Sequence, residues 1–318
     1  MMGKLFKIAL GLAIVGVGMI ALFGVLSQND VFAIVNEGDF VYNELVYDAD
    51  EFTDLNFTFE NRDFIIRPSV DDSIRIEYYT TERDTVTVSE DNQVLTLEND
   101  VEWYNQFFLG FSFLVDDDFY DVYLYLPTSE IYDLDIITSN GTADFDSLSN
   151  LRYIHFRTSN GRITINDSDF TTLDLATSNG GIWLTDVSVT GALQTDTTNG
   201  KINLDTVSAS DISGHTSNGE IILNSINSDS VDLDTSNGAI TATNLTSIDV
   251  RLESTNGDID VSVIGDKDDY EVTMSTSNGD LNYDGIEVSQ EHFNSDGIYE
   301  IELHSSNGDV TIDFITSE

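Results

Sequence analysis

The chain has 318 residues, of which 40% are hydrophobic and 10% aromatic, so it carries enough apolar material for a core and is not of the intrinsically disordered class. Its 12 Lys and Arg residues face 58 Asp and Glu residues, a formal net charge of −46 that makes nucleic acid and anionic lipid headgroups poor partners. Because the sequence contains no cysteine, disulfides, thiolate metal sites and a Cys nucleophile are excluded.

The N-terminus has the pattern of a membrane anchor. Lys4 and Lys7 precede an unbroken apolar run from Ile8 to Leu26. At about 1.5 Å per residue this run spans roughly 29 Å, close to the hydrocarbon thickness of a bilayer. A retained transmembrane helix is predicted over residues 1–29, although the small residues at 31–33 leave a cleaved signal peptide open. The positive-inside rule then predicts a single-pass protein of the cell membrane, with the bulk of the chain extracytoplasmic.

Two less regular segments follow the predicted anchor. Residues 30–50 are predicted to be a short acidic tether. Residues 51–130 contain alternating segments, such as 71–79 and 92–97, that are typical of strands but show no clean repeat. We expect residues 51–130 to form degenerate β coils that cap the repeats after them, because the open edge of a repeat array has to be covered.

A four-residue motif recurs nine times in residues 131–318, as Thr-Ser-Asn-Gly or with a Ser or Thr exchange at its first two positions. The successive glycines are 20, 19, 20, 19, 19, 19, 22 and 29 residues apart. The residues seven positions before and two positions after each glycine are aliphatic in every copy, and most positions between are polar. This alternation predicts two half-buried strands per repeat, joined at a sharp corner.

The repeats favour parallel stacking. Asn-Gly between alternating strands is also the strongest hairpin signal, so an antiparallel meander is the alternative. A hairpin, however, gives no reason for the preceding Thr and Ser or for a constant period. In a parallel stack each residue lies about 4.8 Å from its equivalent, and repetition is expected. The predicted fold is therefore all-β, a parallel β-solenoid (β-helix) with about nine regular coils of 19–20 residues over residues 131–318.

The corner residues are predicted to be structural. Parity with the aliphatic columns places the Thr and Asn side chains inward, so that the amides form a buried hydrogen-bonded ladder. The glycines are expected because the corner requires positive φ. The predicted ladder comprises Asn140, Gly141, Asn160, Gly161, Asn179, Gly180, Asn199, Gly200, Asn218, Gly219, Asn237, Gly238, Asn256, Gly257, Asn278, Gly279, Asn307 and Gly308.

The last coils lengthen after Gly257. The extra residues, at 265–269 and 288–297, are expected to bulge as loops and to be the first place to look for partner recognition. The last coil has no visible cap, so end-to-end pairing into a homo-oligomer is a further hypothesis.

Motifs for catalysis or cofactor binding are not found. The sequence has no glycine-rich phosphate loop, nucleophile elbow or H-E-x-x-H, and no cofactor is predicted. His215 and His304 share a repeat position, but four coils, or about 19 Å, are expected to separate them, too far to share a metal.

Stacked carboxylates on the outer surface give two alternatives. A column of outward aspartates could bind Ca²⁺ weakly, and its candidate ligands are Asp258, Asp260, Asp280 and Asp309. Sugar-cleaving parallel β-helices also build sites from paired acids, next to a basic or aromatic residue. Few such residues exist here beyond Arg251 and Trp183. A solvated acidic face is the simplest interpretation of both sets.

The corners at intervals near 20 residues, the strand that ends at Leu126-Pro127 and the closing segment 308–314 resemble the bacterial "putative adhesin" domain of unknown function. That family includes the membrane-anchored accessory protein of the Lia cell-envelope stress operon. The resemblance covers residues 50–318 and implies a β-solenoid outside the membrane, without catalytic residues to transfer.

The sequence therefore predicts a non-enzymatic surface scaffold, an adhesin-like binding module anchored in the membrane and acting in cell-envelope stress. Its partner would be an unidentified envelope component or protein. A calcium-dependent adhesin and a polysaccharide-active β-helix enzyme are the alternatives.

Overall fold

The computed structural model describes residues 40–82, 84–101, 117–149 and 151–316. Within these ranges the chain forms β-strands and two short 3-10 helices. No helix in the described ranges has the length and apolar character needed to cross a membrane. The predicted anchor, residues 1–29, lies outside the described residues.

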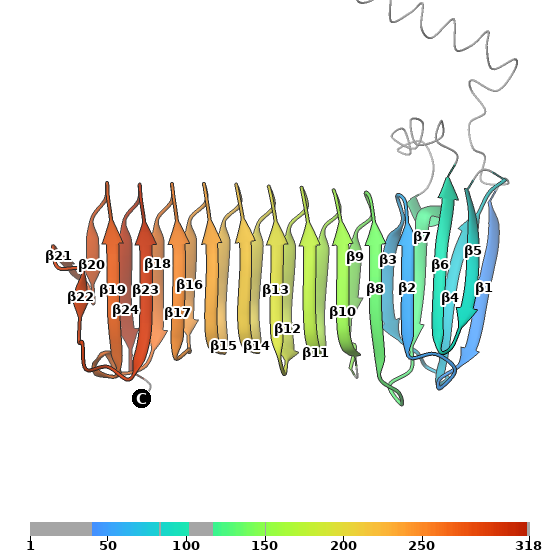
Figure 1. Cartoon of the computed structure of the whole chain (residues 1–318), viewed down its shortest axis with the longest axis horizontal. Helices are drawn as coiled ribbons and strands as arrows, with labels where there is room; N and C mark the ends of the chain where they lie inside the picture. The colour runs from blue at the N-terminus through green and yellow to red at the C-terminus, as the bar shows by residue number, and fades with distance from the viewer. Residues whose placement is uncertain (1–39, 83, 102–116, 150, 317–318) are drawn as a thin grey trace, which may run out of the picture.

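The strands follow one another closely along the chain (Figure 1). The N-terminal part contains β1 Val41–Asp48, β2 Asp54–Phe59, β3 Asp63–Pro68, β4 Ser73–Thr80, β5 Asp84–Asp91, β6 Val94–Val101, η3 Asp117–Tyr120 and β7 Asp121–Leu126. The repeat region begins with β8 Tyr132–Thr138, β9 Ala143–Asp146, β10 Leu151–Thr158, β11 Ile163–Thr177, β12 Ile182–Val189, β13 Ala192–Thr197, β14 Ile202–Thr216 and β15 Ile221–Thr235. It continues with β16 Ile240–Leu245, β17 Asp249–Ser254, β18 Ile259–Ile264, η4 Lys267–Asp269, β19 Tyr270–Thr276, β20 Leu281–Tyr283, β21 Ile286–Val288, β22 His292–Phe293, β23 Tyr299–Ser305 and β24 Val310–Ile315.

The coils stack in parallel, and each contributes to two facing sheets (Figure 1). Sheet 1 contains the segments that lead into the corners, and sheet 2 contains the segments that leave them; the long strands β11, β14 and β15 contribute to both. Equivalent residues are paired, as Ile163 is with Ile182 and Ile182 is with Ile202. The predicted parallel β-solenoid is thus confirmed against the antiparallel meander.

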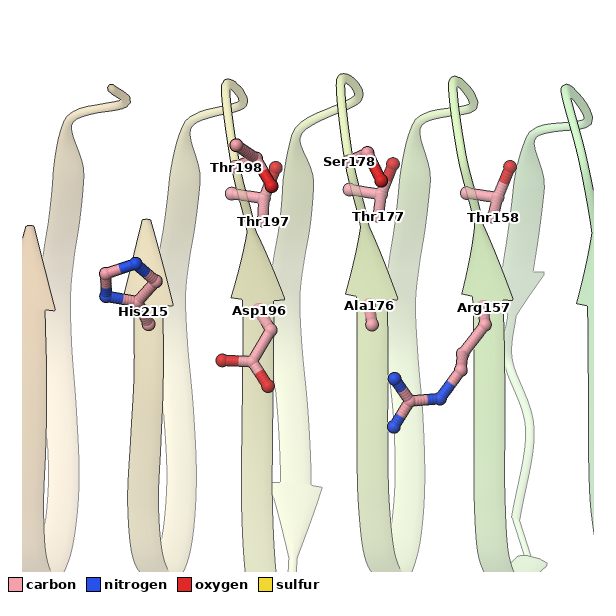
Figure 2. A pocket seen from close by; sticks show the side chains of 9 residues that line it. All are labelled: Arg157, Thr158, Ala176, Thr177, Ser178, Asp196, Thr197, Thr198 and His215. Carbon is pink, nitrogen blue, oxygen red and sulfur yellow. The ribbon is translucent and has the colours of Figure 1, made fainter. Parts of the chain in front are cut away.

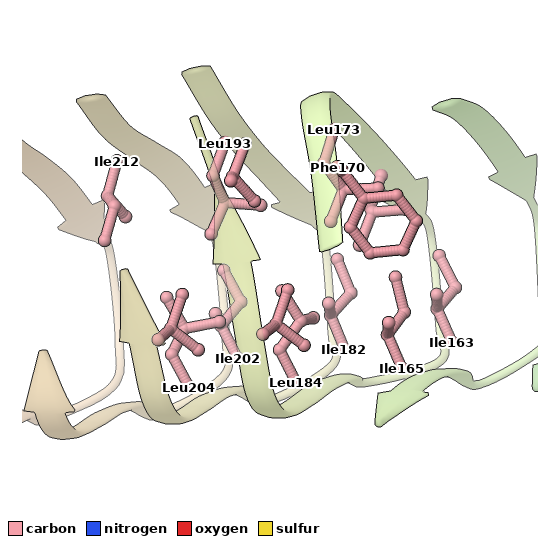
Figure 3. Packing of buried hydrophobic residues seen from close by; sticks show 14 of the residues in the cluster. Ile163, Ile165, Phe170, Leu173, Ile182, Leu184, Leu193, Ile202, Leu204 and Ile212 are labelled. Carbon is pink, nitrogen blue, oxygen red and sulfur yellow. The ribbon is translucent and has the colours of Figure 1, made fainter. Parts of the chain in front are cut away.

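The core lies between the two sheets and consists of the predicted aliphatic columns (Figure 3). Leu173, Leu193 and Ile212 from sheet 1 face Ile182 and Ile202 from sheet 2, and all are at most 1% exposed. Every residue of the columns seven positions before and two positions after the motif glycines is buried, which confirms the predicted parity. At about 25 cal/mol per Å² of apolar area, this continuous core is the main stabilising contribution.

A second bend in six of the coils is absent from the sequence prediction. Six residues after each motif glycine from Gly141 to Gly238, a non-glycine residue has positive φ, among them Asp186 at 54°, Thr206 at 57° and Ser225 at 55°. Sheet pairing is interrupted there, and the inward parity shifts by one residue: Leu184 and Val187 are both buried. The left-handed residue acts as a bulge that bends the strand back over the core.

The C-terminal coil is inserted between two earlier ones, which corrects the sequential order expected. Strand β23 pairs with both β17 and β19, and β24 pairs with both β18 and β20. The chain therefore skips one coil position after Gly257 and later returns to fill it, which explains the long glycine spacings of 22 and 29.

The loop and the open edge expected at this end are also corrected. Residues 286–288 and 292–293 form β21 and β22, which pair antiparallel with β20 and β19. These short strands cover the outermost coil. The C-terminal end of the stack therefore has a cap, built in part from residues 288–297, which were expected to form a loop.

The N-terminal end is capped by antiparallel strands. β2 and β3 form a coil in register with β8 and β9, and β6 and β7 extend the two sheets beyond it. Antiparallel pairing then closes each sheet, with β5 on β6 and with β4 and β1 beyond β7. Residues 41–48, expected to belong to a tether, are thus strand β1.

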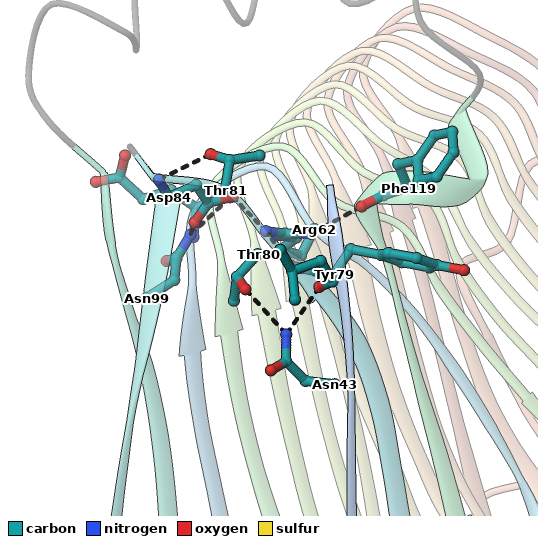
Figure 4. Close-up of polar contacts among 10 residues, drawn as sticks. Asn43, Arg62, Tyr79, Thr80, Thr81, Asp84, Asn99 and Phe119 are labelled. Atoms are coloured by element: carbon teal, nitrogen blue, oxygen red, sulfur yellow. Dashed lines mark hydrogen bonds and ion pairs between the residues drawn. The ribbon is translucent and has the colours of Figure 1, made fainter. Parts of the chain in front are cut away.

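A buried ion pair holds this N-terminal cap (Figure 4). Arg62 is 0% exposed and forms an ion pair with Asp84. Its guanidinium also donates to the carbonyl oxygens of Tyr79 at 2.9 Å and Phe119 at 3.0 Å, and Asn99 donates to the other oxygen of Asp84 at 3.1 Å. Arg62 therefore joins the first corner to the strands of the cap.

Candidate functional site

The corners carry the asparagine ladder, but on the outer surface. Each motif asparagine donates from its amide nitrogen to the amide oxygen of its neighbour, for example from Asn218 to Asn199 at 2.7 Å. The chain of bonds extends below the first motif to Asn61. All the motif asparagines are exposed, so the predicted inward orientation is wrong. The parity argument failed because the corner is a turn, in which the alternation of a strand no longer holds.

Close stacking explains the corner glycines. None of them has the positive φ expected; within the described residues Gly285 alone among the glycines does. Instead, a Cβ atom on Gly161, Gly180 or Gly219 would lie 1.7 Å from the carbonyl oxygen of the glycine one coil away. The coils approach so closely at this point that a side chain does not fit.

The first residue of each motif forms an inner ladder, and here the inward prediction is correct. Thr216 is 0% exposed, and its hydroxyl donates to the Gly200 carbonyl oxygen of the neighbouring coil at 3.0 Å. The same hydroxyl accepts from the Gly219 N–H at 3.0 Å. Each corner thus pairs backbone groups that would otherwise be buried without partners.

Below these corners, the outer surface of sheet 1 has a shallow groove of about 360 Å³ (Figure 2). Its floor is formed by the row Arg157, Ala176, Asp196 and His215, which lie on successive coils. The small Ala176 side chain leaves the gap between Arg157 and Asp196. The rim is formed by corner residues: Thr158, Thr177, Ser178, Thr197 and Thr198.

One hydrogen-bond pattern beside the groove resembles that of a serine hydrolase. His215 Nδ1 lies 2.5 Å from Asp234 Oδ2, and His215 Nε2 lies 3.3 Å from Ser217 Oγ. Hydrolysis also needs free N–H donors for the oxyanion. The backbone N–H groups of Ser217 and Asn218 both donate to the Thr198 carbonyl oxygen, at 3.1 and 3.0 Å. With its His and Asp side chains each almost half exposed, this group lacks the dry, prearranged surroundings of such a site.

The histidine positions differ from the expected ones because of the inserted coil. In the row of His215, the next residues are Asp234, Glu253 and His304. His304 is therefore three coils from His215, or about 14 Å, instead of four. The two histidines remain too far apart to share a metal ion.

Three of the four calcium candidates lie next to one another in the structure. The inserted coil places Asp309 between Asp258 and Asp280, and the Asp309 N–H donates to Asp258 Oδ1 at 2.9 Å. The Asp280 N–H donates likewise to Asp309 Oδ1 at 2.8 Å, whereas Asp260 lies opposite Thr311. In the described part of the chain, no group of three or more His, Asp or Glu side chains is arranged to hold a metal ion.

The two candidates for a sugar site do not meet. Arg251 lies on β17 in sheet 1, where Glu253 pairs with it at 2.7 Å, and Trp183 lies on β12 in sheet 2. The sequence prediction missed the cation that does contact Trp183: the guanidinium carbon of Arg162 lies 4.4 Å from the centre of the indole. Their shared proximity to corner glycines one coil apart could have indicated this pair.

Solved structures match most of the chain at low identity. A "putative adhesin" from Bacteroides fragilis is 13% identical, with a TM-score of 0.42 over 86% of this chain and 97% of that one. A "putative adhesin" from Parabacteroides distasonis is 11% identical, with a TM-score of 0.44 over 87% and 98%. A "putative lipid binding protein" from the same species is 11% identical, with a TM-score of 0.43 over 88% and 98%.

Sequence comparison gives the family. No curated protein matches this chain. The model of the family described as Toastrack DUF4097 matches residues 52–313, which include all the corners and most of the N-terminal cap and of the inserted coil. With more than half of its length matched, the chain belongs to the Toastrack DUF4097 family.

Proposed function

We propose that this protein is a non-enzymatic, adhesin-like surface module that binds envelope components or neighbouring proteins through the sides of its solenoid. The observation that carries this proposal is that the inner and outer sides of each sheet have different roles. The inward columns and the corner ladders hold the stack rigid, and the outward rows present side chains at regular intervals. A rigid rod with open, shallow grooves suits binding to an extended partner.

The proposal includes the predicted anchor. Residues 1–29 would hold the protein in the cell membrane, with the solenoid on the extracytoplasmic side. The resemblance to the accessory protein of the Lia operon supports a role in cell-envelope stress. Protease treatment of intact cells tests the topology: external protease should remove the solenoid, and protection of the solenoid until cells are lysed would contradict it.

Binding is tested with the full chain and isolated envelope fragments. We expect saturable retention of the fragments that is unchanged when calcium is chelated. Binding that needs calcium would support the alternative, a calcium-dependent adhesin. No binding with or without calcium would remove the proposed function.

A hydrolase activity, distinct from the polysaccharide-active alternative, has a direct test of its own, because Asp234, His215 and Ser217 show the hydrogen-bond pattern of a serine hydrolase. With an activated aryl ester, we expect the same rate for the wild type and for Ser217→Ala. A rate that falls at least tenfold in Ser217→Ala would overturn the non-enzymatic proposal.

End-to-end pairing of two copies remains part of the proposal, but it would use the N-terminal end of the stack. It was expected from an open C-terminal coil, and that coil carries the short strands β21 and β22. At the other end β1 and β5, of eight residues each, pair only with β4 and β6 among the described strands, so both are longer edges than β21 and β22. Sedimentation of the full chain over a concentration series tests this pairing, and a strict monomer would exclude it.

A further inference from the structure

Arg162 differs from the other cationic residues of the described chain. Each of the others has a carboxylate within 4.0 Å: Arg62, Arg67, Arg75, Arg152, Arg157, Lys201, Arg251 and Lys267. Arg162 is exposed and has no such partner among the described residues. Its side chain lies over the Trp183 indole, whose centre is 4.4 Å from the guanidinium carbon.

A glycine on the neighbouring coil leaves space for this pair. Hydrogen bonds between coils place Arg162, Gly181 and Lys201 in one row just after the corners. A Cβ atom at Gly181 would lie 2.2 Å from the Trp183 ring, so the indole occupies the space that a side chain would take. At about 4.8 Å per coil, Arg162 and Lys201 are about 10 Å apart, with the indole between them.

The surroundings of the pair carry little free charge. Thr164 and Asn203 flank Trp183 in the register of sheet 2. Two carboxylates in the same rows are already paired, Asp144 with Arg67 at 2.6 Å and Glu220 with Lys201 at 3.5 Å. A third, Asp63, is two coils from Arg162 and accepts from the Thr142 N–H at 2.6 Å. Because the Debye length is about 8 Å at physiological ionic strength, the distant acidic surface is largely screened. The charges close to Arg162 therefore determine whether an anionic ligand is attracted to this site.

We propose that Arg162 and Trp183 form a binding site for an acidic saccharide, and that Lys201 borders it. The planar guanidinium, held against the indole, can bind a carboxylate through two parallel hydrogen bonds. The partly exposed indole offers apolar area to the sugar ring beside that carboxylate. This inference rests on the proposed adhesin-like function and names the ligand class of one surface.

The test measures binding of a tetrameric oligogalacturonate to the full chain by calorimetry. The methyl-esterified tetramer is the matched neutral ligand, because it keeps the sugar rings and removes the charge. Arg162→Gln removes the cation, Arg162→Lys keeps a charge but not the planar fork, and Trp183→Leu removes the indole. Arg251→Gln, in sheet 1, is the matched control, because Arg251 is exposed and already paired with Glu253.

We expect the acidic tetramer to bind and the ester to bind at least tenfold more weakly. Arg162→Gln and Trp183→Leu should each weaken binding at least tenfold, Arg162→Lys by a smaller factor, and Arg251→Gln by less than twofold. Equal binding of acid and ester, equal loss in Arg251→Gln, or no loss in Arg162→Gln would overturn the site. Unchanged melting temperatures show that a loss is not due to unfolding.

The two proposals fail differently. If the wild type retains envelope fragments but Arg162→Gln does so equally well and no tetramer binds, this site is wrong and the surface function stands. If the wild type retains no fragments at all, the proposed function fails.

Discussion

The side-chain amide of Asn307 donates to Asn256 at 3.0 Å, although 51 residues separate them in the sequence. Asn278, which precedes Asn307 in the chain, lies on its other side and donates to it at 2.9 Å. The ladder therefore follows the stack of coils and not the order of the chain. The corner glycines also follow the stack and not the chain, because each one lies against the corner glycine of the neighbouring coil.

The outer ladder predicts a modest stability effect at Asn218. Asn218→Leu removes the bond to Asn199 at 2.7 Å and the bond received from Asn237 at 3.0 Å. Because these amides are exposed, water replaces part of the loss, and we expect a decrease of about 1 kcal/mol in the free energy of unfolding. Ser236→Ala, at an adjacent corner, is the control and should change it by less than about 0.5 kcal/mol. Urea unfolding measures both, and equal stability of Asn218→Leu and wild type would contradict the ladder's contribution.

The corner glycines predict a much larger effect. Gly219→Ala would place a methyl group 1.7 Å from the Gly200 carbonyl oxygen, and neither backbone can move without disturbing the coils beside it. We expect a loss of about 3 kcal/mol or more in the free energy of unfolding. Gly285→Ala has open space around it but positive φ, and should cost only about 1 kcal/mol. Thermal melts that rank the two variants in the opposite order would refute the stacking explanation.

The inner ladder can be tested with a substitution of the same shape. Thr216→Val removes the hydroxyl that bonds both the Gly200 carbonyl oxygen and the Gly219 N–H. Leaving these backbone groups unpaired should cost about 1–3 kcal/mol. Thr216→Ser should keep most of the stability, because Ser254 makes the equivalent bond at 2.9 Å. A Val variant as stable as the Ser variant would show that the hydroxyl contributes nothing.

The buried ion pair of the N-terminal cap predicts non-additive effects. Asp84→Ala leaves the Arg62 guanidinium without its carboxylate in a site that is 0% exposed, so we expect a loss of about 3–5 kcal/mol. Arg62→Met combined with Asp84→Leu removes both charges and should be more stable than Asp84→Ala alone. A double variant less stable than Asp84→Ala would contradict this account.

Buried tyrosines predict a loss of stability at alkaline pH. Tyr132 is 0% exposed, and its hydroxyl donates to the Ala49 carbonyl oxygen at 2.8 Å. Burial, and then nearby carboxylates, raise its pKa above the usual value of about 10. The neutral form is thus favoured in the folded state, and its stabilisation is fully present below pH 10 and lost as the pH rises further. In Tyr132→Phe, urea unfolding should show a smaller decrease in stability between pH 9 and pH 11 than in the wild type. An equal decrease in both proteins would assign the effect elsewhere.

Periodicity and spacing predicted the solenoid, its parallel pairing and its core. These features could be read from the sequence because parallel stacking repeats one local environment. Equivalent positions in successive coils then have equivalent neighbours, and they carry the same residue types, as in the column of Ile182 and Ile202. The inward Thr216 could be predicted for the same reason, because it lies on a strand, where parity holds.

The corners and ends were decided by tertiary contacts. Asn218 turns outward because a corner does not follow strand parity, and Gly219 is fixed by the neighbouring coil and not by its own φ. No local signal distinguishes a long coil with a loop from a chain that skips a position and returns, so the place of Asn307 could not be predicted. The contact of Arg162 with Trp183 has the same origin: it joins two coils 21 residues apart through side chains that are not repeated in other coils.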